Sequence, residues 1–166
     1  MVVIINGSLA VGKTSVAWAL AEIMQNSVML DGDYIGAIFP GDFHDSKWLD
    51  YLYKTFATLI KFHKENGYDN FVINYVFETP ASLNQLIKHL SPIDTKNKSF
   101  LLVCSEDVQR QRILARNNNQ LEWELKRYVE LNNILKDATS NGYIGREIDT
   151  SNHTAMQIAE NIFNSL

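Results

Sequence analysis

A glycine-rich segment near the start of the chain could bind the phosphates of a nucleotide. It fits the pattern G-x-x-x-x-G-K-[ST], and its residues are Gly7, Ser8, Leu9, Ala10, Val11, Gly12, Lys13 and Thr14, followed by Ser15. In such a P-loop, backbone N–H groups point at phosphate oxygens, the lysine reaches the β- and γ-phosphates, and the hydroxyl binds Mg²⁺. We therefore expect residues 7–15 to bind nucleotide, Lys13 to act in catalysis and Thr14 to hold the metal. A glycine-rich turn with an exposed lysine is the alternative.

Two carboxylates, Asp31 and Asp33, follow the next short apolar run. Ligands of open α/β sheets bind beyond the carboxyl ends of the strands, which is where this pair would lie. Asp31 would then belong to the surroundings of the metal. Asp33 would accept a proton from an acceptor hydroxyl, since phosphoryl transfer requires positioning and proton removal. A solvated Asp-Gly-Asp turn is the alternative, and the nearby P-loop favours the functional interpretation.

The elements that must position these side chains alternate between strand and helix. Short β-branched or apolar runs predict strands at residues 2–6, 28–31, 70–77, 99–104 and 146–149. Helical spacing of apolar residues, with capping residues, predicts helices at 14–25, 46–66, 79–90, 105–116, 121–139 and from about 154. Alternation of this kind indicates an α/β fold, with a parallel sheet covered by helices on both faces.

The order of these features resembles a group of small P-loop kinases. The P-loop, the strand that ends hydrophobic-Asp-x-Asp and the closing Ile148-Asp149-Thr150-Ser151 are similar to the shikimate kinase, gluconate kinase and chloramphenicol phosphotransferase relatives, within the nucleoside monophosphate kinase-like fold. The resemblance covers nearly the whole chain. It implies a three-layer fold with a five-stranded parallel sheet in the order 2-3-1-4-5, an acceptor-binding segment at about 32–66 and a small lid at about 116–125. It also implies ATP with Mg²⁺ as donor, and transfer of the γ-phosphoryl group to a small-molecule hydroxyl.

Arginines on the fourth predicted helix are candidates for binding the transferred phosphoryl group. Arg112 and Arg116 are four residues apart and share a helix face. In the resembled kinases, arginines at this place clamp the phosphates as the lid closes, a task that suits their planar fork. We expect Arg116 to act in catalysis, with Arg112 as the second candidate. A solvated helix face is the alternative for both.

Two stretches depart from the expected pattern. Asn74 stands where a second P-loop signature has an aspartate. Its amide could bind an acceptor or a water, or it could be a satisfied buried amide. Glu78, four residues further along, could also face the cleft. Residues 32–46 contain no lysine or arginine, although a phosphorylated or carboxylated acceptor normally meets an arginine. We therefore expect an uncharged or partly apolar hydroxyl compound as acceptor. Apolar and aromatic residues of this region are Tyr34, Ile35, Phe39, Phe43 and Trp48.

Composition limits the remaining classes of protein. A length of 166 residues is typical of one domain, so we treat residues 1–166 as a single unit. The net charge of −4 weighs against nucleic acid as a partner. The single cysteine excludes an internal disulfide, and no apolar run approaches the roughly 18 residues of a membrane span. We expect a cytoplasmic protein, monomeric or a small homo-oligomer, whose partners are ATP and a small molecule.

Two other functions use the same loop. A GTPase-type switch would use Asp33-Tyr34-Ile35-Gly36 as its D-x-x-G motif, but these residues follow Thr14 closely and the guanine-reading Asn-Lys-x-Asp motif is absent. A nucleotide-binding ATPase or regulatory module without small-molecule kinase activity stays as the alternative, because Asn74 departs from the usual pattern. The two differ in whether ATP consumption depends on an acceptor.

Overall fold

The computed structural model describes residues 1–36, 46–94, 96–116 and 119–166, and all elements below lie in this part of the chain. The strands are β1 (Val2–Gly7), β2 (Ser27–Asp31), β3 (Asn70–Asn74), β4 (Asn97–Val103) and β5 (Arg146–Asp149). The helices are α1 (Lys13–Ile23), α2 (Ser46–Glu65), α3 (Pro80–Leu90), α4 (Glu106–Ala115), α5 (Leu121–Asn141) and α6 (Ala155–Phe163).

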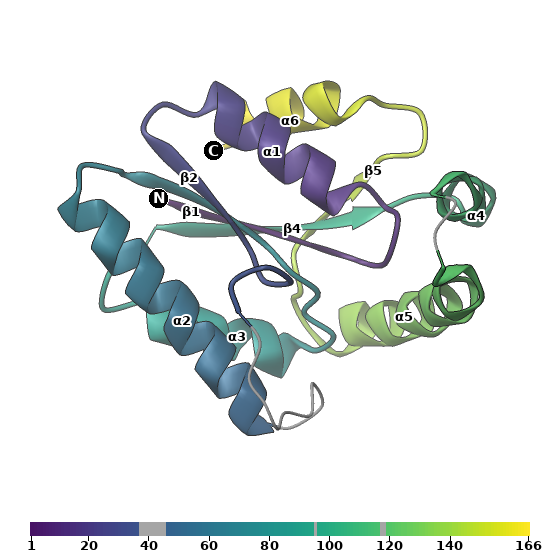
Figure 1. Cartoon of the computed structure of the whole chain (residues 1–166), viewed down its shortest axis with the longest axis horizontal. Helices are drawn as coiled ribbons and strands as arrows, with labels where there is room; N and C mark the ends of the chain where they lie inside the picture. Colours follow the sequence, from purple (N-terminus) through teal and green to yellow (C-terminus); the bar gives the residue numbers. More distant parts are fainter. Residues whose placement is uncertain (37–45, 95, 117–118) are drawn as a thin grey trace.

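The five strands form one parallel sheet in the order β2-β3-β1-β4-β5, with helices on both faces (Figure 1). This confirms the expected three-layer fold and its strand order. The order matters for the site, because β1 is central and its carboxyl end lies between those of β3 and β4. The segment that follows β1 is therefore close to the segments that follow β3 and β4.

The two faces of β1 show how the layers are held together. Val3 and Ile5 pack in the cluster that includes α1 and α6, whereas Val2 and Ile4 pack in the cluster that includes α2 and α3. Successive side chains of a strand point to opposite faces, so a strand covered on both faces is largely apolar on both, as residues 2–5 are. Figure 1 shows α1 and α6 above the sheet and α2 and α3 below it.

Side-chain caps fix where several helices begin. Thr79 accepts a hydrogen bond from the Ser82 N–H, and the Ser82 hydroxyl accepts one from the Thr79 N–H, so the two form a capping box with Pro80 as the first residue of α3. Ser105 caps α4 by accepting from the Val108 N–H. These caps satisfy N–H groups that have no partner inside the helix. The helix starts predicted at residues 79–80 and 105 agree with them.

The third strand is shorter than the predicted 70–77 and ends at Asn74. The cause is Asn6, which is fully buried and bonds to both backbone groups of Phe77. Its Oδ1 accepts from the Phe77 N–H at 2.9 Å, and its Nδ2 donates to the Phe77 carbonyl at 3.1 Å and to the Ile144 carbonyl at 3.2 Å. A side chain thus replaces strand pairing beyond Asn74, a long-range contact that local periodicity does not reveal.

No helix in the described part of the chain combines the length and the hydropathy that a membrane span requires.

Candidate active site

The P-loop connects the end of β1 to the start of α1. Gly7 (φ 147°) is close to β4, and a Cβ there would lie 2.6 Å from the Leu102 carbonyl oxygen. Gly12 (φ 99°) is the N-cap of α1 and lacks a side chain that could accept from the first N–H groups of the helix. Helix N-termini with open N–H groups bind anions, and the macrodipole adds to the attraction. The loop therefore has the geometry of a phosphate site.

Lys13 folds back over this loop. Its Nζ donates to the Ser8 carbonyl oxygen at 2.8 Å. Burial and, to a smaller extent, the Arg116 charge lower the pKa of Lys13 to about 8, against the opposing effect of the nearby Asp33 and Asp31 carboxylates. A bound polyphosphate would add the negative charge that this buried ammonium lacks.

An oxygen-rich group lies beside the loop, where β2 and β3 end. Asp31 and Asn74 are directly paired across the two strands, and the Asn74 Nδ2 donates to the Asp31 carboxylate and, at 3.0 Å, to the Thr14 hydroxyl. The Asn74 Oδ1 is buried and has no hydrogen-bond partner among the described residues. Mg²⁺ prefers oxygen ligands and is usually held by one or two carboxylates plus phosphates and waters. This donor set, with its unpartnered oxygen, fits Mg²⁺ and a metal-bound water.

Asp33 follows Asp31 in a tight turn. Its backbone N–H donates to the Asp31 Oδ1 at 2.9 Å, so one carboxylate fixes the position of the other. The pKa of Asp33 is raised, first because its carboxyl group is partly removed from water and second because Asp31 is near, while Lys13 opposes the shift. A carboxylate with a raised pKa is a stronger base than an ordinary one.

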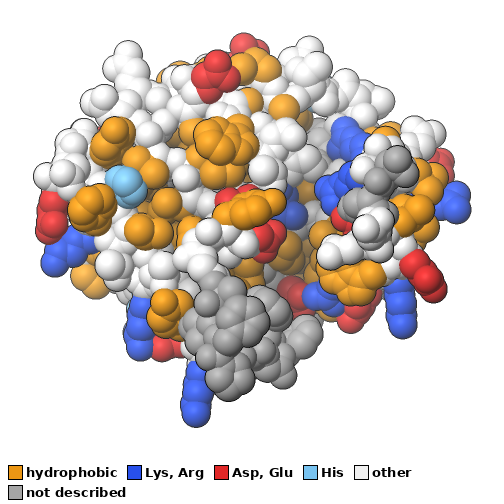
Figure 2. Space-filling model, in the orientation of Figure 1, with side chains coloured by type: hydrophobic (Ala, Val, Ile, Leu, Met, Phe, Trp, Pro, Cys, Tyr) orange, Lys and Arg blue, Asp and Glu red, His pale blue; other side chains and the backbone are white. Residues whose placement is uncertain are grey.

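The P-loop lies between two cavities. The larger is about 600 Å³ and includes Leu9 of the loop, Asp33, and residues of α2, α5 and the segment after β3. The smaller is about 310 Å³ and includes the other side of the loop, with Arg112, Arg116 and Thr150. Both have volumes that suit small ligands. Figure 2 shows acidic and basic side chains around the hollowed middle of the visible face.

The two candidate arginines line the smaller cavity, and each has a partner in the protein. Arg112 donates to the Thr150 carbonyl at 2.8 Å and to its hydroxyl at 3.1 Å, so it is fixed to the segment between β5 and α6. Arg116 forms an ion pair with Glu124 at 2.6 Å. Arg116 is the one whose charge reaches Lys13. The structure therefore places both arginines beside the P-loop: the Arg116 charge acts on Lys13, and Arg112 donates to the Val11 carbonyl of the loop at 3.4 Å as well as to Thr150.

Sequence reasoning missed two residues of this region and left a third without a role. Glu124 falls in the buried stripe of α5 and its second oxygen has no partner among the described residues. Its signal was an acidic residue at a position that helical spacing makes apolar. Tyr53 lines the larger cavity, and no motif in the sequence gives it a functional role. Arg127 had no motif, and only the fold brings it to Glu78, at 2.5 Å. The positions of Phe39 and Phe43 lie outside the described residues.

Comparisons with known proteins agree with the fold. The model of the family described as Zeta toxin matches residues 1–163. A solved structure of the tunicamycin resistance protein of Deinococcus radiodurans is 19% identical with a TM-score of 0.65, covering 99% of this chain and 94% of that one. A sugar kinase from Janibacter sp. is 13% identical with a TM-score of 0.69, covering 98% and 92%.

An APS kinase from Mycobacterium tuberculosis, solved with AMPPNP and APS, is 11% identical with a TM-score of 0.67, covering 98% of this chain and 95% of that one. At these identities the likeness establishes the fold alone. No curated protein matches the sequence.

Proposed function

Because the chain belongs to the Zeta toxin family, we propose that it is an ATP-dependent phosphotransferase that moves the γ-phosphoryl group to a hydroxyl of a small molecule. The family match and the P-loop kinase fold support nucleotide-dependent phosphoryl transfer. The observation that supports the rest is the position of the P-loop between two cavities, with Asp33 in the larger one. One cavity can then hold the nucleoside of the donor and the other the acceptor.

The donor would bind along residues 7–15, whose N–H groups and helix N-terminus attract its phosphates. Its base and ribose would enter the smaller cavity, where Arg112 is held against Thr150. We therefore assign Arg112 to the wall of the base site, and not to the phosphate clamp that its helical spacing suggests. Thr14 and Asp31 would hold Mg²⁺, with Asn74 on a metal-bound water, and the ion would neutralise charge on the β- and γ-phosphate oxygens.

Phosphoryl transfer then requires three things from the chain. Asp33 accepts the proton of the acceptor hydroxyl. The acceptor oxygen bonds to the γ-phosphorus as the bond between the γ-phosphorus and the bridging oxygen of ADP breaks. Lys13 and Arg116 stabilise the negative charge on the transferring group, Arg116 after exchanging Glu124 for phosphate. The cavity walls position the hydroxyl in line with the bond that breaks.

An acceptor-dependence assay tests this function. ATP consumption is measured with and without a panel of small hydroxyl compounds, for the wild type and for Lys13→Ala. We expect strong acceptor dependence in the wild type and loss of turnover in Lys13→Ala with the fold intact. Lys61→Ala is the matched control, since Lys61 is exposed on α2 and lines neither cavity. Slow turnover that is indifferent to every acceptor would support the nucleotide-binding ATPase or regulatory module instead.

A further inference from the structure

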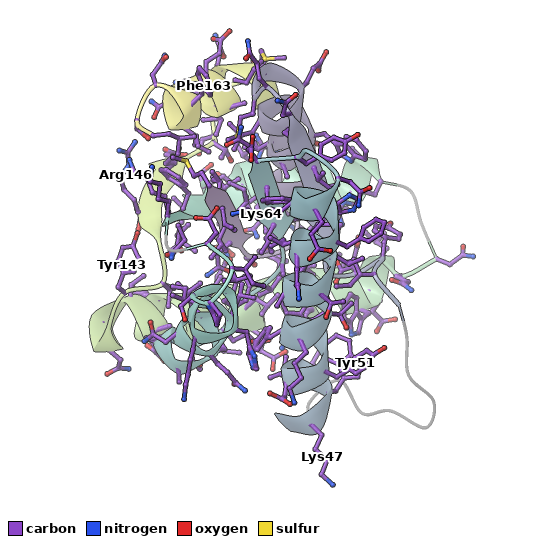
Figure 3. The ribbon with its side chains drawn as sticks, turned by 90° about the vertical axis from the view of Figure 1, so that its left-hand side faces the viewer. Lys47, Tyr51, Lys64, Tyr143, Arg146 and Phe163 are labelled. Atoms are coloured by element: carbon purple, nitrogen blue, oxygen red, sulfur yellow. The ribbon has the colours of Figure 1, made fainter. Side chains whose placement is uncertain are left out.

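The larger cavity has polar groups that point to a ligand. The Tyr53 side chain is fully buried and lines it, but its hydroxyl has no hydrogen-bond partner among the described residues. Burial raises the pKa of Tyr53 to about 12, with the nearby Ser82 hydroxyl opposing, so the group is a neutral donor and acceptor. A buried hydroxyl without a partner costs free energy that a bound polar group would recover. Tyr53 belongs to α2, and two other residues of this helix, Lys47 and Tyr51, project outward instead (Figure 3).

The charges of this cavity have one dominant sign. Among the described residues that line it, Arg127 is the only cation, whereas the carboxylates are Asp33, Glu78 and Glu130. Arg127 is bound to two of them, to Glu78 at 2.5 Å and to Glu130 at 2.8 Å. Residues 32–46 contain no lysine or arginine either. An anionic ligand would therefore meet excess negative charge and an arginine that is already occupied.

Arg127 itself is well suited to bind a phosphate or carboxylate. Its side chain is only 17% exposed, and its planar fork matches both groups. Burial alone would lower the pKa of Arg127, but Glu130 and Glu78 raise it, so the guanidinium stays charged beside the two carboxylates. The two glutamates thus neutralise the single cation among the described residues that line this cavity.

We propose that the acceptor is a hydroxyl compound without a negatively charged group, and that Glu78 and Glu130 set this specificity by occupying Arg127. This inference rests on the proposed function, because it assumes that the larger cavity is the acceptor site. Repulsion and the desolvation of an anion exclude phosphorylated and carboxylated acceptors. Uncharged and cationic compounds bind, with Tyr75 and Trp123 as apolar surface and the Tyr53 hydroxyl as a polar contact.

The test uses pairs of compounds that differ by one anionic group: uridine and UMP, glucose and glucose 6-phosphate, glucosamine and glucosamine 6-phosphate. Equilibrium binding to the full chain with AMPPNP and Mg²⁺ tests the inference, and turnover with ATP tests the proposed function. For the wild type we expect the member without the anionic group to bind at least about tenfold more tightly. In Glu78→Gln/Glu130→Gln we expect this preference to fall at least about tenfold, because Arg127 becomes available.

Three further variants test whether Arg127 is the cause of any change in preference. Adding Arg127→Ala to the double variant is expected to remove the gained anion binding, while Glu122→Gln is the control, since Glu122 is exposed on α5 and outside the cavity. Glu130→Gln alone, at a side chain that is 57% exposed, gives a smaller shift with little risk to folding. Tighter binding of the anionic members by the wild type would overturn the inference. The expected preference without any phosphoryl transfer would overturn the proposed function alone.

Discussion

Nucleotide affinity is expected to weaken in alkaline solution because of Lys13. In the free protein, burial lowers the pKa of this lysine to about 8, from an ordinary value of 10.5. A bound polyphosphate stabilises the ammonium form, so the pKa in the complex returns to at least its ordinary value. The complex then holds a proton that the free protein has lost above pH 8. Affinity is therefore constant below pH 8 and falls as the pH rises above it.

The size of this effect follows from the two pKa values. With a pKa near 8, the lysine of the free protein is about 90% protonated at pH 7 and about 10% at pH 9, whereas the lysine of the complex stays protonated over this range. The dissociation constant of MgADP should rise about tenfold between these values. The measurement is isothermal titration calorimetry from pH 7 to 9.5, in two buffers of different ionisation enthalpy, which also counts the protons taken up.

Lys13→Arg is the control for this titration, because a guanidinium stays charged throughout the range and should give a dissociation constant that does not depend on pH. The same slope in Lys13→Arg and the wild type would assign the effect to another group. No slope and no proton uptake in the wild type would show that Lys13 is not desolvated as its burial indicates.

Three other changes have defined outcomes. Asp33→Asn should lower kcat far more than ATP affinity, in steady-state kinetics with a turned-over acceptor, because it removes the base; equal losses in both would make Asp33 a metal or structural residue. Wild-type kcat should also fall in acid, as the pH drops through the raised pKa of Asp33. Asn74→Ala should raise the Mg²⁺ concentration needed for half-maximal turnover, and an unchanged requirement would contradict the assigned metal site. Asn6→Ala should lower the free energy of unfolding by about 2–4 kcal/mol in urea, since it removes four buried hydrogen bonds, one with the Gly7 N–H and three with the backbones of Phe77 and Ile144. Asn133→Ala, at an exposed position, should change it little.

The sequence predicts the fold well because its strongest signals are local. Strand β1 begins with four consecutive apolar residues, and caps such as Thr79 and Ser105 mark where helices begin. The P-loop is equally local, since its function depends on neighbouring backbone groups. Asn6 shows the limit of this reasoning: its contacts with Phe77 and Ile144 join residues far apart in the sequence, and they end β3 earlier than its apolar run suggests.

The acceptor cavity is where sequence reasoning and structure contribute separately. The absence of lysine and arginine from residues 32–46 gives a negative argument about one segment, and it would fail if another element supplied a cation. The fold does bring in such a cation, Arg127 of α5, which no motif identifies. It also brings Glu78 from the segment after β3 and Glu130 from α5, so the added positive charge is cancelled. Residues 32–46 and the group of Arg127, Glu78 and Glu130 thus both leave the cavity without an available positive charge among the residues that the structure describes. A change to an anionic acceptor would require changes in Glu78 and Glu130 as well as in residues 32–46.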